Sequence, residues 1–372
     1  MVNNTGVPDD ARYARQRILP QIGDEGQTRL ARAHVAIVGV GALGTQGADL
    51  LARAGVGRLT LIARDIVELT NLQRQTLFTE ADAAQSLPKV VAAAQRLREV
   101  NRTITIDAKP ADVRPSNIAS LLALDEHESS DSEAGSRARP TIILDCTDNF
   151  LTRYLLNDVA VRFSLPLIYA GVLGTIGTQF TIRPNPIANA TPCLRCVFPD
   201  CPAPGTTPTC ETAGVLGPAV GVMASLQACE AIRTIVDPNS STARVHTIEV
   251  WPFGVRSIVL GPPNPECPCC ALRRFEFLDA SRHESQAEST LCGQNAVQIL
   301  PVSPARLDLA AIASSWQSAA GVRTSSVNRF FARLELADHG LRLTLFPDAR
   351  AIVQGTIDIT IARNVYARYV GL

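Results

Sequence analysis

A short run of apolar residues near the start of the chain leads into a glycine-rich turn and then a helical pattern. The run covers Val35–Val38, the turn Gly39–Gly44, and the helical pattern reaches Leu51. This order predicts a strand, a turn and a helix. Glycines at 39, 41 and 44 allow a tight turn and bring backbone N–H groups close to a phosphate, although a GxGxxG pattern alone is weak support for nucleotide binding.

Apolar strand patterns alternate with helical patterns through the first half of the chain. We expect strands at 58–63, 103–107, 141–145 and 166–170, and helices at 89–100, 116–123 and 150–163. Such alternation predicts βαβ units and a Rossmann-like, mainly parallel sheet in an α/β domain. Residues 177–183, 243–251 and 255–260 alternate like half-exposed strands and predict an antiparallel extension, and a helix is expected from Pro218 to about Val236.

The remaining patterns divide the chain into two domains. Residues 1–280 form the first, with a helical start at 12–30 that Gly23 and Gly26 interrupt. It contains a solvated insertion at 125–140, expected to be disordered, and a proline- and cysteine-rich loop at 184–212. A polar linker at 281–290 precedes a small α+β domain at 291–372. That domain has a helix at 307–318, strands at 328–336, 341–346 and 352–355, and a final helix ending at Tyr369.

Composition narrows the function classes. The 372 residues are 46% hydrophobic and 19% charged with no net charge, so no strong positive field favours a nucleic-acid partner. The N-terminus lacks a secretory pattern, and the apolar stretch 215–228 is too short and too interrupted for a membrane span. We therefore expect a cytoplasmic protein, in which ten cysteines favour metal binding or thiol chemistry over disulfides.

Cationic residues follow the glycine turn where a dehydrogenase would carry a ribose-binding acid. The second strand ends at Ala63 in place of that acid, and Arg74 and Lys89 come after it. These side chains suit a triphosphate better than a dinucleotide. Asp148 follows a further apolar strand, so its carboxylate is expected at the carboxyl edge of the sheet, where doubly wound folds bind ligands.

These motifs occur in the order GxGxxG, NLQRQ, PK, DCTDN, CxxC and a second CxxC, from Arg12 to Cys270. In this order the chain resembles the adenylyltransferases of the MoeB/ThiF family, which are relatives of the ubiquitin-activating enzymes. The resemblance implies a homodimeric enzyme that uses ATP and Mg²⁺ to activate the C-terminal glycine of a ubiquitin-like sulfur-carrier protein ending in Gly-Gly. It leaves the carrier and its pathway open, whether molybdopterin, thiamine or another product.

The resemblance also implies roles for individual residues. Asp148 is expected to hold the metal, Lys89 and Arg74 to meet the phosphates, Asn71 to position them, and Arg15 to reach the nucleotide of the neighbouring subunit. The nucleophile is a chain-terminal carboxylate that is already ionised at neutral pH, so catalysis is expected to be electrostatic. The residues alone also allow a simpler interpretation. In it, Lys89 is an exposed lysine at the start of a helix, and Asp148 caps the helix that follows it.

Ala63 is a departure from the family pattern, which has an acid at this position. Ribose binding then depends on another group, or ATP binds weakly. Asp65, two residues later, matches a second acid of the pattern and is a candidate for nucleotide binding.

Two CxxC pairs, Cys193/Cys196 and Cys267/Cys270, predict a closed structural Zn²⁺ site, a zinc knuckle with four thiolates. Cys269 is a competing ligand, and reduced, unliganded cysteines are the alternative.

Cys210 stands shortly before a predicted helix start, where the helix dipole favours a thiolate. By resemblance it is a candidate to accept the activated glycine as a covalent link, and the alternative is a spectator thiol. Cys292, in the C-terminal domain, fits a buried structural cysteine better than a sulfur relay.

The leading hypothesis is thus an adenylyltransferase acting on a carrier-protein C-terminus. Two alternative functions are also considered. One is an NAD(P)-dependent oxidoreductase, which the residues after the second strand disfavour. The other is a non-catalytic scaffold that kept the fold but binds ATP poorly because of Ala63.

Overall fold

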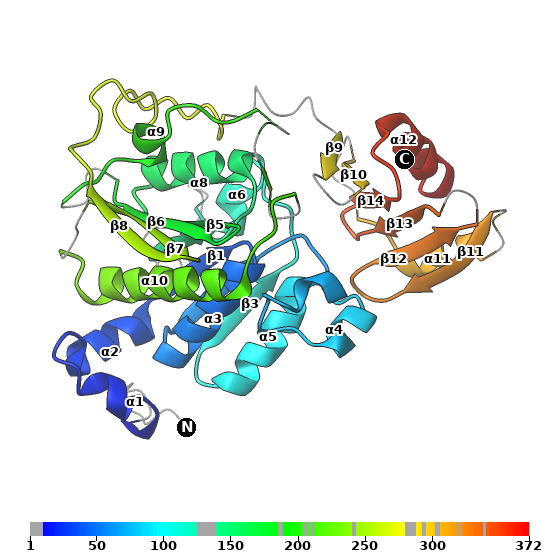
Figure 1. Ribbon diagram of the computed structural model, residues 1–372. Coiled ribbons are helices and arrows are strands. Elements are labelled where there is room, and N and C mark those ends of the chain that lie inside the picture. Colours follow the sequence, from blue (N-terminus) through cyan, green and yellow to red (C-terminus); the bar gives the residue numbers. More distant parts are fainter. Residues whose placement is uncertain are drawn as a thin grey trace. The chain divides into compact units, whose positions relative to one another are not determined.

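The structure is a computed structural model that divides into two compact units, residues 1–280 and 281–372 (Figure 1). It describes residues 10–124, 139–184, 189–203, 206, 208–209, 212–239, 243–279, 288–291, 295–301, 306–317, 319, 321–337 and 340–371. Most of the expected insertion at 125–140, the first part of the expected linker, and Cys210 and Cys292 lie outside these residues.

The first unit is built on one eight-stranded sheet in the order β3-β2-β1-β4-β5-β6-β7-β8. Strands β3 to β5 in this order run parallel, and β6, β7 and β8 add antiparallel pairs. The strands are β1 (His34–Val38), β2 (Arg58–Ile62), β3 (Thr105–Lys109), β4 (Ile142–Asp145), β5 (Leu167–Leu173), β6 (Ile176–Ile182), β7 (Arg244–Val250) and β8 (Phe253–Val259). The predicted α/β fold class, a mainly parallel sheet with an antiparallel extension, is confirmed.

Helices cover both faces of the sheet, as the continuous apolar runs of β1 and β4 require. In Figure 1, α3, α5 and α10 lie on one face and α6, α8 and α9 on the other. The helices of this unit are α1 (Asp10–Arg17), α2 (Gly23–Arg32), α3 (Ala42–Ala54), the 3₁₀ helix η1 (Leu69–Asn71), α4 (Glu80–Ala84), α5 (Lys89–Val100), α6 (Ile118–Leu121), α8 (Phe150–Arg162), α9 (Leu194–Val197) and α10 (Gly217–Val236).

The order of the strands creates a switch point between β1 and β4. The chain leaves β1 toward β2 and β3, then returns to β4 on the other side of β1. Loops after β1 and β4 therefore diverge at the carboxyl edge of the sheet, which is where doubly wound folds bind ligands.

One expectation about the N-terminal helices was wrong. Gly26 does not interrupt the helical pattern but lies inside α2. A Cβ at this position would come within 2.8 Å of Val236 at the end of α10, so the glycine permits close packing of the two helices.

Helix α10 is long and apolar enough, by length and composition, to cross a membrane, and half of its most apolar window is buried. It packs against α3, β4, β5 and β6 in the sheet core. We interpret it as a core helix of the first unit, since core helices share this composition with membrane spans.

The second unit is a six-stranded antiparallel sheet in the order β11-β12-β13-β14-β10-β9, with α11 and α12 packed on it. Its elements are β9 (Glu288–Leu291), β10 (Ala296–Ile299), α11 (Leu309–Trp316), β11 (Val322–Val327), β12 (Ala332–Leu336), β13 (Arg342–Leu345), β14 (Ala351–Gln354) and α12 (Ile359–Tyr369). The indole Nε1 of Trp316 donates to the carbonyl of Tyr369 at 2.7 Å and joins the two helices.

Three features of this unit differ from expectation. The strand expected at 328–336 begins in a turn, because the Asn328 side chain accepts hydrogen bonds from the backbone of Phe330 and Phe331. Strand β11 was missed because its sequence is mostly polar. Strand β9 begins at Glu288, inside the stretch expected as linker.

Candidate functional site

The glycine turn after β1 lies directly against the loop that follows β4. Gly39 has a φ of +90°, and a Cβ there would collide with the carbonyl of Cys146. A Cβ at Gly44 would collide with the carbonyl of Gly39, so glycine is required at both positions. At Gly41 the nearest atom is 3.7 Å away, Nε2 of Gln75. The turn is therefore tight at its two ends and open at its centre, the shape needed to accept a phosphate.

Gln75 adds an unusual polar group beside this opening. Its side chain is only 4% exposed, and its Oε1 is buried with no hydrogen-bond partner in the described part of the chain. A buried polar atom without a partner costs about 1–3 kcal/mol, so such atoms tend to mark a place that a ligand or ion completes.

Lys89 is brought to this edge by the loop after β2. Its backbone N–H donates to the carbonyl of Asp65 at 2.9 Å, and its Nζ lies 3.2 Å from an Asp65 carboxylate oxygen. Lys89 is 7% exposed, so it is not the surface lysine that its helix-start position also allowed. Asp65 therefore holds Lys89 in place.

Arg64 stands at the centre of the charges on this side of the turn. Its guanidinium lies 3.0 Å from Asp112 and 3.7 Å from Asp65. Burial works to lower the pKa of Arg64, but the carboxylates of Asp112, Asp65 and Asp148 outweigh it and raise that pKa. Asp148 is thus close enough to interact with the charge of Arg64.

Asp148 lies exposed just beyond the end of β4. The cap of helix α8 is its neighbour Asn149, whose Oδ1 accepts from the N–H of Thr152 at 2.8 Å. Asp148 is therefore not the helix cap that the sequence also allowed, and its carboxylate is available at the carboxyl edge.

Buried groups fix the backbone on which Asp148 is carried. Asp145 accepts hydrogen bonds from the N–H and Oγ1 of Thr147 at 3.0 and 2.7 Å, and Arg153 donates to the Thr147 carbonyl at 2.6 Å. Burial raises the pKa of Asp145, and Arg153 opposes that rise. Arg153 also donates to the Tyr169 hydroxyl at 2.6 Å, which anchors the loop to β5.

The NLQRQ loop packs on the N-terminal half of α3. The carbonyl of Arg74 accepts from the side chain of Gln46, and Gln75 lies beside Gly41. Asn71 is buried, with its Oδ1 receiving the N–H of Glu68 at 3.1 Å. The half-buried Arg74 donates to the carbonyl of Thr70 at 2.9 Å, so its guanidinium folds back on its own turn.

The structure therefore gathers most of the sequence-predicted residues at one edge: the three glycines, Asp65, Asn71, Arg74, Lys89 and Asp148. Arg15 is separate. It is exposed on α1, which packs near the far end of α3, where Gln16 donates to the carbonyl of Ala54. Cys210 lies outside the described residues.

Four cysteine thiols form a second centre. Cys193, Cys196, Cys267 and Cys270 offer sulfur atoms that all lie within 4.8 Å of one another. Three of the sulfur pairs, Cys196–Cys270, Cys193–Cys267 and Cys193–Cys196, are 3.4, 3.6 and 3.9 Å apart. Four sulfurs at about 2.3 Å from a tetrahedral Zn²⁺ lie about 3.8 Å apart, so the cluster has the size of a zinc site. Cys269 is not among the four.

The thiols interact strongly in the absence of a cation. Hydrogen bonds from its neighbours, Cys196 foremost, lower the pKa of Cys193, while the bond to Cys193 raises that of Cys270. The cluster therefore favours a thiolate that shares protons with the other thiols. A divalent cation stabilises four thiolates at once, which is the chemistry these residues fit.

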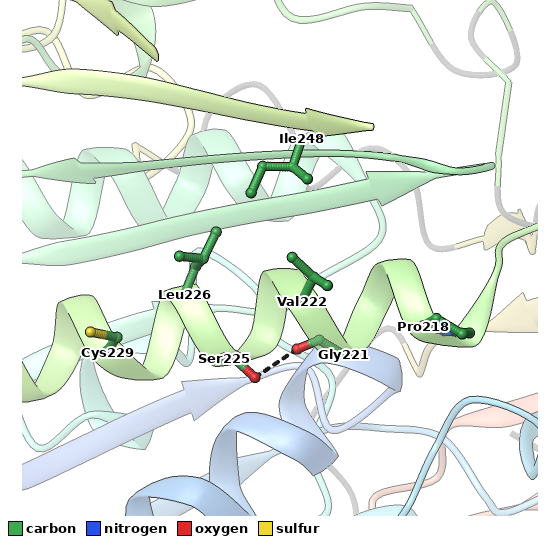
Figure 2. Close-up of a pocket in the computed structure, with 7 residues that line it drawn as sticks. All are labelled: Pro218, Gly221, Val222, Ser225, Leu226, Cys229 and Ile248. Atoms are coloured by element: carbon green, nitrogen blue, oxygen red, sulfur yellow. Dashed lines mark hydrogen bonds between the residues drawn. The ribbon is translucent and has the colours of Figure 1, made fainter. Parts of the chain in front are cut away.

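A separate groove lies along α10 beside β7, the strand that carries Ile248 (Figure 2). It is lined by Pro218, Gly221, Val222, Ser225, Leu226, Cys229 and Ile248. The Ser225 hydroxyl is satisfied by the Gly221 carbonyl of the same helix. None of the sequence-predicted site residues is among these seven, so the groove is distinct from the edge that carries the glycine turn.

A comparison with protein families matches residues 13–269 to the model described as the ThiF family. The chain belongs to the ThiF family. The predicted resemblance to MoeB/ThiF adenylyltransferases is thereby confirmed, and the match spans both the glycine turn and the first two cysteines of the second CxxC region.

Curated relatives of this ThiF-family chain are named adenylyltransferases. The sulfur carrier protein ThiS adenylyltransferase of Bacillus subtilis is 35% identical over 97% of this chain and 99% of its own length. The sulfur carrier protein adenylyltransferase of Thermus thermophilus is 36% identical over 70% of this chain and 90% of its own length. The Bacillus protein thus spans the second unit as well.

Among solved structures, Escherichia coli MccB with ATP has a TM-score of 0.55 at 22% identity. The match covers 71% of this chain and 76% of that one, and it shows that the two share a fold.

Several residues of the candidate site were missed by sequence reasoning. Arg64 and Gln75 lie next to residues that the motifs identified, but nothing in the local pattern showed that Arg64 pairs with Asp112 and Asp65 or that Gln75 lies beside Gly41. Arg153 follows DCTDN by one helical turn, a spacing that places it back over that loop. That spacing was the available signal.

Proposed function

We propose that this protein is an ATP-dependent adenylyltransferase that activates the C-terminal glycine of a ubiquitin-like sulfur-carrier protein ending in Gly-Gly. The observation that carries the proposal is the exposed carboxylate of Asp148, which does not cap α8 and lies at the same edge of the sheet as the buried, ion-paired Lys89 and the open glycine turn. Membership of the ThiF family and the names of its relatives support the reaction class.

The reaction joins two anions. The carrier's terminal carboxylate attacks the α-phosphorus of ATP, a C–O–P link forms, and pyrophosphate leaves with the electron pair of the broken P–O bond. The carboxylate has an ordinary pKa of about 3.3–3.7 and needs no general base. The protein therefore has to reduce charge repulsion and stabilise the leaving group.

The residues at the edge divide this work. The backbone N–H groups of the glycine turn receive the phosphates, with Gly41 leaving the space they need. Lys89 and Arg74 offset negative charge on the leaving pyrophosphate, and Asn71 positions the loop. Asp148 would hold Mg²⁺, which when bound neutralises phosphate charge. Arg15 would act from the second subunit of a homodimer, because in its own subunit it lies at the other end of α3.

Nucleotide binding here lacks the ribose acid at Ala63. Asp65 is paired with Lys89 and Arg64, so we infer that it does not bind the ribose directly and contributes to nucleotide binding by positioning Lys89. ATP binding is then weaker than in a member with an acid at this place, since each charge-assisted hydrogen bond contributes about 1.5–3 kcal/mol.

We also propose that the four-cysteine cluster holds a structural Zn²⁺. All four sulfurs would be ligands, so the site has no open position for chemistry. Cys210 is the proposed acceptor of the activated glycine, through a thioester that releases AMP. The protein is proposed to act in the cytoplasm.

Pyrophosphate exchange tests the proposal. Purified protein with ATP, Mg²⁺ and a ThiS-like carrier should incorporate labelled pyrophosphate into ATP, and removal of the carrier's two terminal glycines should abolish incorporation. Asp148→Asn should reduce exchange about 10²–10³-fold, while Glu99→Gln, an exposed carboxylate on α5, should leave it unchanged.

The alternatives give different results. A scaffold that has lost productive ATP binding would show no exchange with any carrier. An oxidoreductase would instead purify with bound NAD(P), which Asp148→Asn would not release.

A further inference from the structure

The two halves of the cysteine cluster come from distant parts of the chain. Cys193 and Cys267 are 74 positions apart, yet their sulfurs lie 3.6 Å from each other. Bringing such segments together has an entropic cost that the metal, or other contacts, must offset. The contacts around the cluster show which side chains do this.

Asn157, on helix α8, contacts both halves at once. Its Oδ1 accepts from the backbone N–H of Leu194, the residue after Cys193, at 2.8 Å. Its Nδ2 donates to the sulfur of Cys269, between the two cysteines of the second pair, at 3.2 Å. Asn157 is completely buried, so neither bond has competition from water.

Two further contacts hold the segments that flank the cluster. The carboxylate of the neighbouring Asp158 accepts from the backbone N–H groups of Phe277 and Leu278 at 2.8 and 3.3 Å. Arg195, inside the first CxxC, lies 3.1 Å from Glu276, beyond the second. Helix α8 thus serves as a template on which the two pairs are assembled.

We propose that Asn157 is a positioning residue that pre-assembles the two CxxC pairs for Zn²⁺, with Cys269 as its anchor and not as a ligand. The inference rests on the zinc site of the proposed function. Groups that orient metal ligands without touching the metal typically change its affinity 10- to 100-fold when they are removed. The amide of Asn157 does so by fixing the backbone of one pair and a thiol of the other.

The test measures zinc affinity by competition with a chromophoric chelator on the full chain. Asn157→Ala should weaken binding about 10- to 100-fold at an unchanged stoichiometry of one Zn²⁺. Cys269→Ala, which removes the acceptor of Nδ2 together with the contacts of the thiol to Asp158 and Cys193, should weaken it less, and Cys269→Ser, which keeps an acceptor, should restore it. The double variant Asn157→Ala with Cys269→Ala should be no weaker than Asn157→Ala alone.

Asn101→Ala is the matched control. Asn101 is also fully buried and also bridges two segments, donating to the Tyr13 hydroxyl and the Ala52 carbonyl at 2.8 Å each. Its removal should lower stability but leave zinc affinity unchanged. Equal weakening by Asn101→Ala would show that general loosening, not positioning, sets the affinity, and would overturn the inference.

Other outcomes separate the inference from the assignments beneath it. A wild-type protein that binds zinc with an affinity indifferent to Asn157→Ala overturns the inference alone. Loss of the stoichiometric zinc in Cys269→Ala makes Cys269 a ligand and also overturns it. If the wild-type protein binds no zinc, both the zinc assignment and the inference are overturned. Carrier-dependent pyrophosphate exchange, measured on the same preparations, tests the adenylyltransferase proposal separately.

Discussion

The edge with the glycine turn and the cysteine cluster are joined by one helix but built in opposite ways. At the start of α8, Asp148 is exposed, and the nearby charges of Lys89 and Arg64 are paired with carboxylates. Near its end, the thiols lie against a hydrophobic core and are held by buried hydrogen bonds. The first arrangement can exchange a ligand, because its charges can re-pair with phosphate, and the second is a closed site.

Substitution of Lys89, at the edge with the glycine turn, tests the first half of this comparison and has the largest expected effect. Lys89→Met removes a cation while keeping the length of the side chain. We expect carrier-dependent pyrophosphate exchange to fall about 10²–10³-fold, the usual loss for one electrostatic donor, with little change in Tm since Asp65 is partly exposed.

The control for this variant is Lys109→Met. Lys109 is half-buried at the end of β3 and donates to the Leu121 carbonyl. The pyrophosphate exchange activity of Lys109→Met should stay within about twofold of wild type. Normal exchange in Lys89→Met would remove this lysine from the phosphate site.

Substitution in the cysteine cluster should lower the stability of the protein more than its catalytic activity. Cys267→Ser removes one proposed ligand from a buried site, and we expect a lower Tm by about 5 °C or more because lost metal binding is lost folding free energy. Thermal unfolding followed by circular dichroism, with and without a chelator, measures it. Cys229→Ser, at an exposed position on α10, should unfold like wild type, and a chelator-insensitive wild type would contradict the zinc assignment.

A substitution that restores an acid at position 63 tests whether the edge with the glycine turn lacks a ribose-binding group. Ala63→Asp places an acid at the partly exposed position where the resemblance to the MoeB/ThiF pattern led us to expect one. We expect ATP to bind about tenfold more tightly, from one or two new charge-assisted hydrogen bonds. Isothermal titration with ATP measures the change, and Ala63→Asn, which has the same shape without the charge, should gain less. Unchanged affinity in both variants would mean that another group already contacts the ribose.

The smallest expected effect concerns Asp145, the buried residue that fixes the loop carrying Asp148. Burial raises the pKa of Asp145, so the folded chain holds this proton more tightly than the unfolded chain, whose value is about 3.9. Stability therefore falls as pH rises from about 4 through the raised pKa, by about 1.4 kcal/mol for each unit of the shift. Asp145→Asn keeps an acceptor for Thr147 and has no proton to lose.

Urea unfolding between pH 4 and 7 checks this expectation. The free energy of unfolding of Asp145→Asn minus that of wild type should grow with pH across the window and then become constant. If this difference in the free energy of unfolding does not vary with pH, the titration of Asp145 does not contribute to the pH dependence of stability.

Most elements of the first unit could be predicted because they follow local patterns. The predicted helix at 89–100 agrees with α5 at both ends, and the apolar runs of β1, β2 and β4 stand within one or two residues of their predictions. The second unit was harder. Its edge strand β11 is mostly polar, and a two-fold alternation with few apolar positions gives little signal.

The candidate site was predictable as a list of residues but not as a set of contacts. Motif order named Lys89, Asp65 and Asp148, yet the pairing of Lys89 with Asp65 depends on how the loop after β2 returns to α5. Likewise, the choice of Asn149 over Asp148 as the cap of α8 is a matter of backbone geometry, since both residue types are good caps.

By itself the sequence determined the order of strands and helices, the glycine turn and two pairs of cysteines. These are encoded by residues close together in the chain, whose spacing fixes which side chains share a face. The tertiary structure decided between the predicted Cys270 and its competitor Cys269, and it alone showed that Asn157 bridges the two pairs. Contacts between residues more than 30 positions apart depend on how helices pack on the sheet, and no local pattern records that packing.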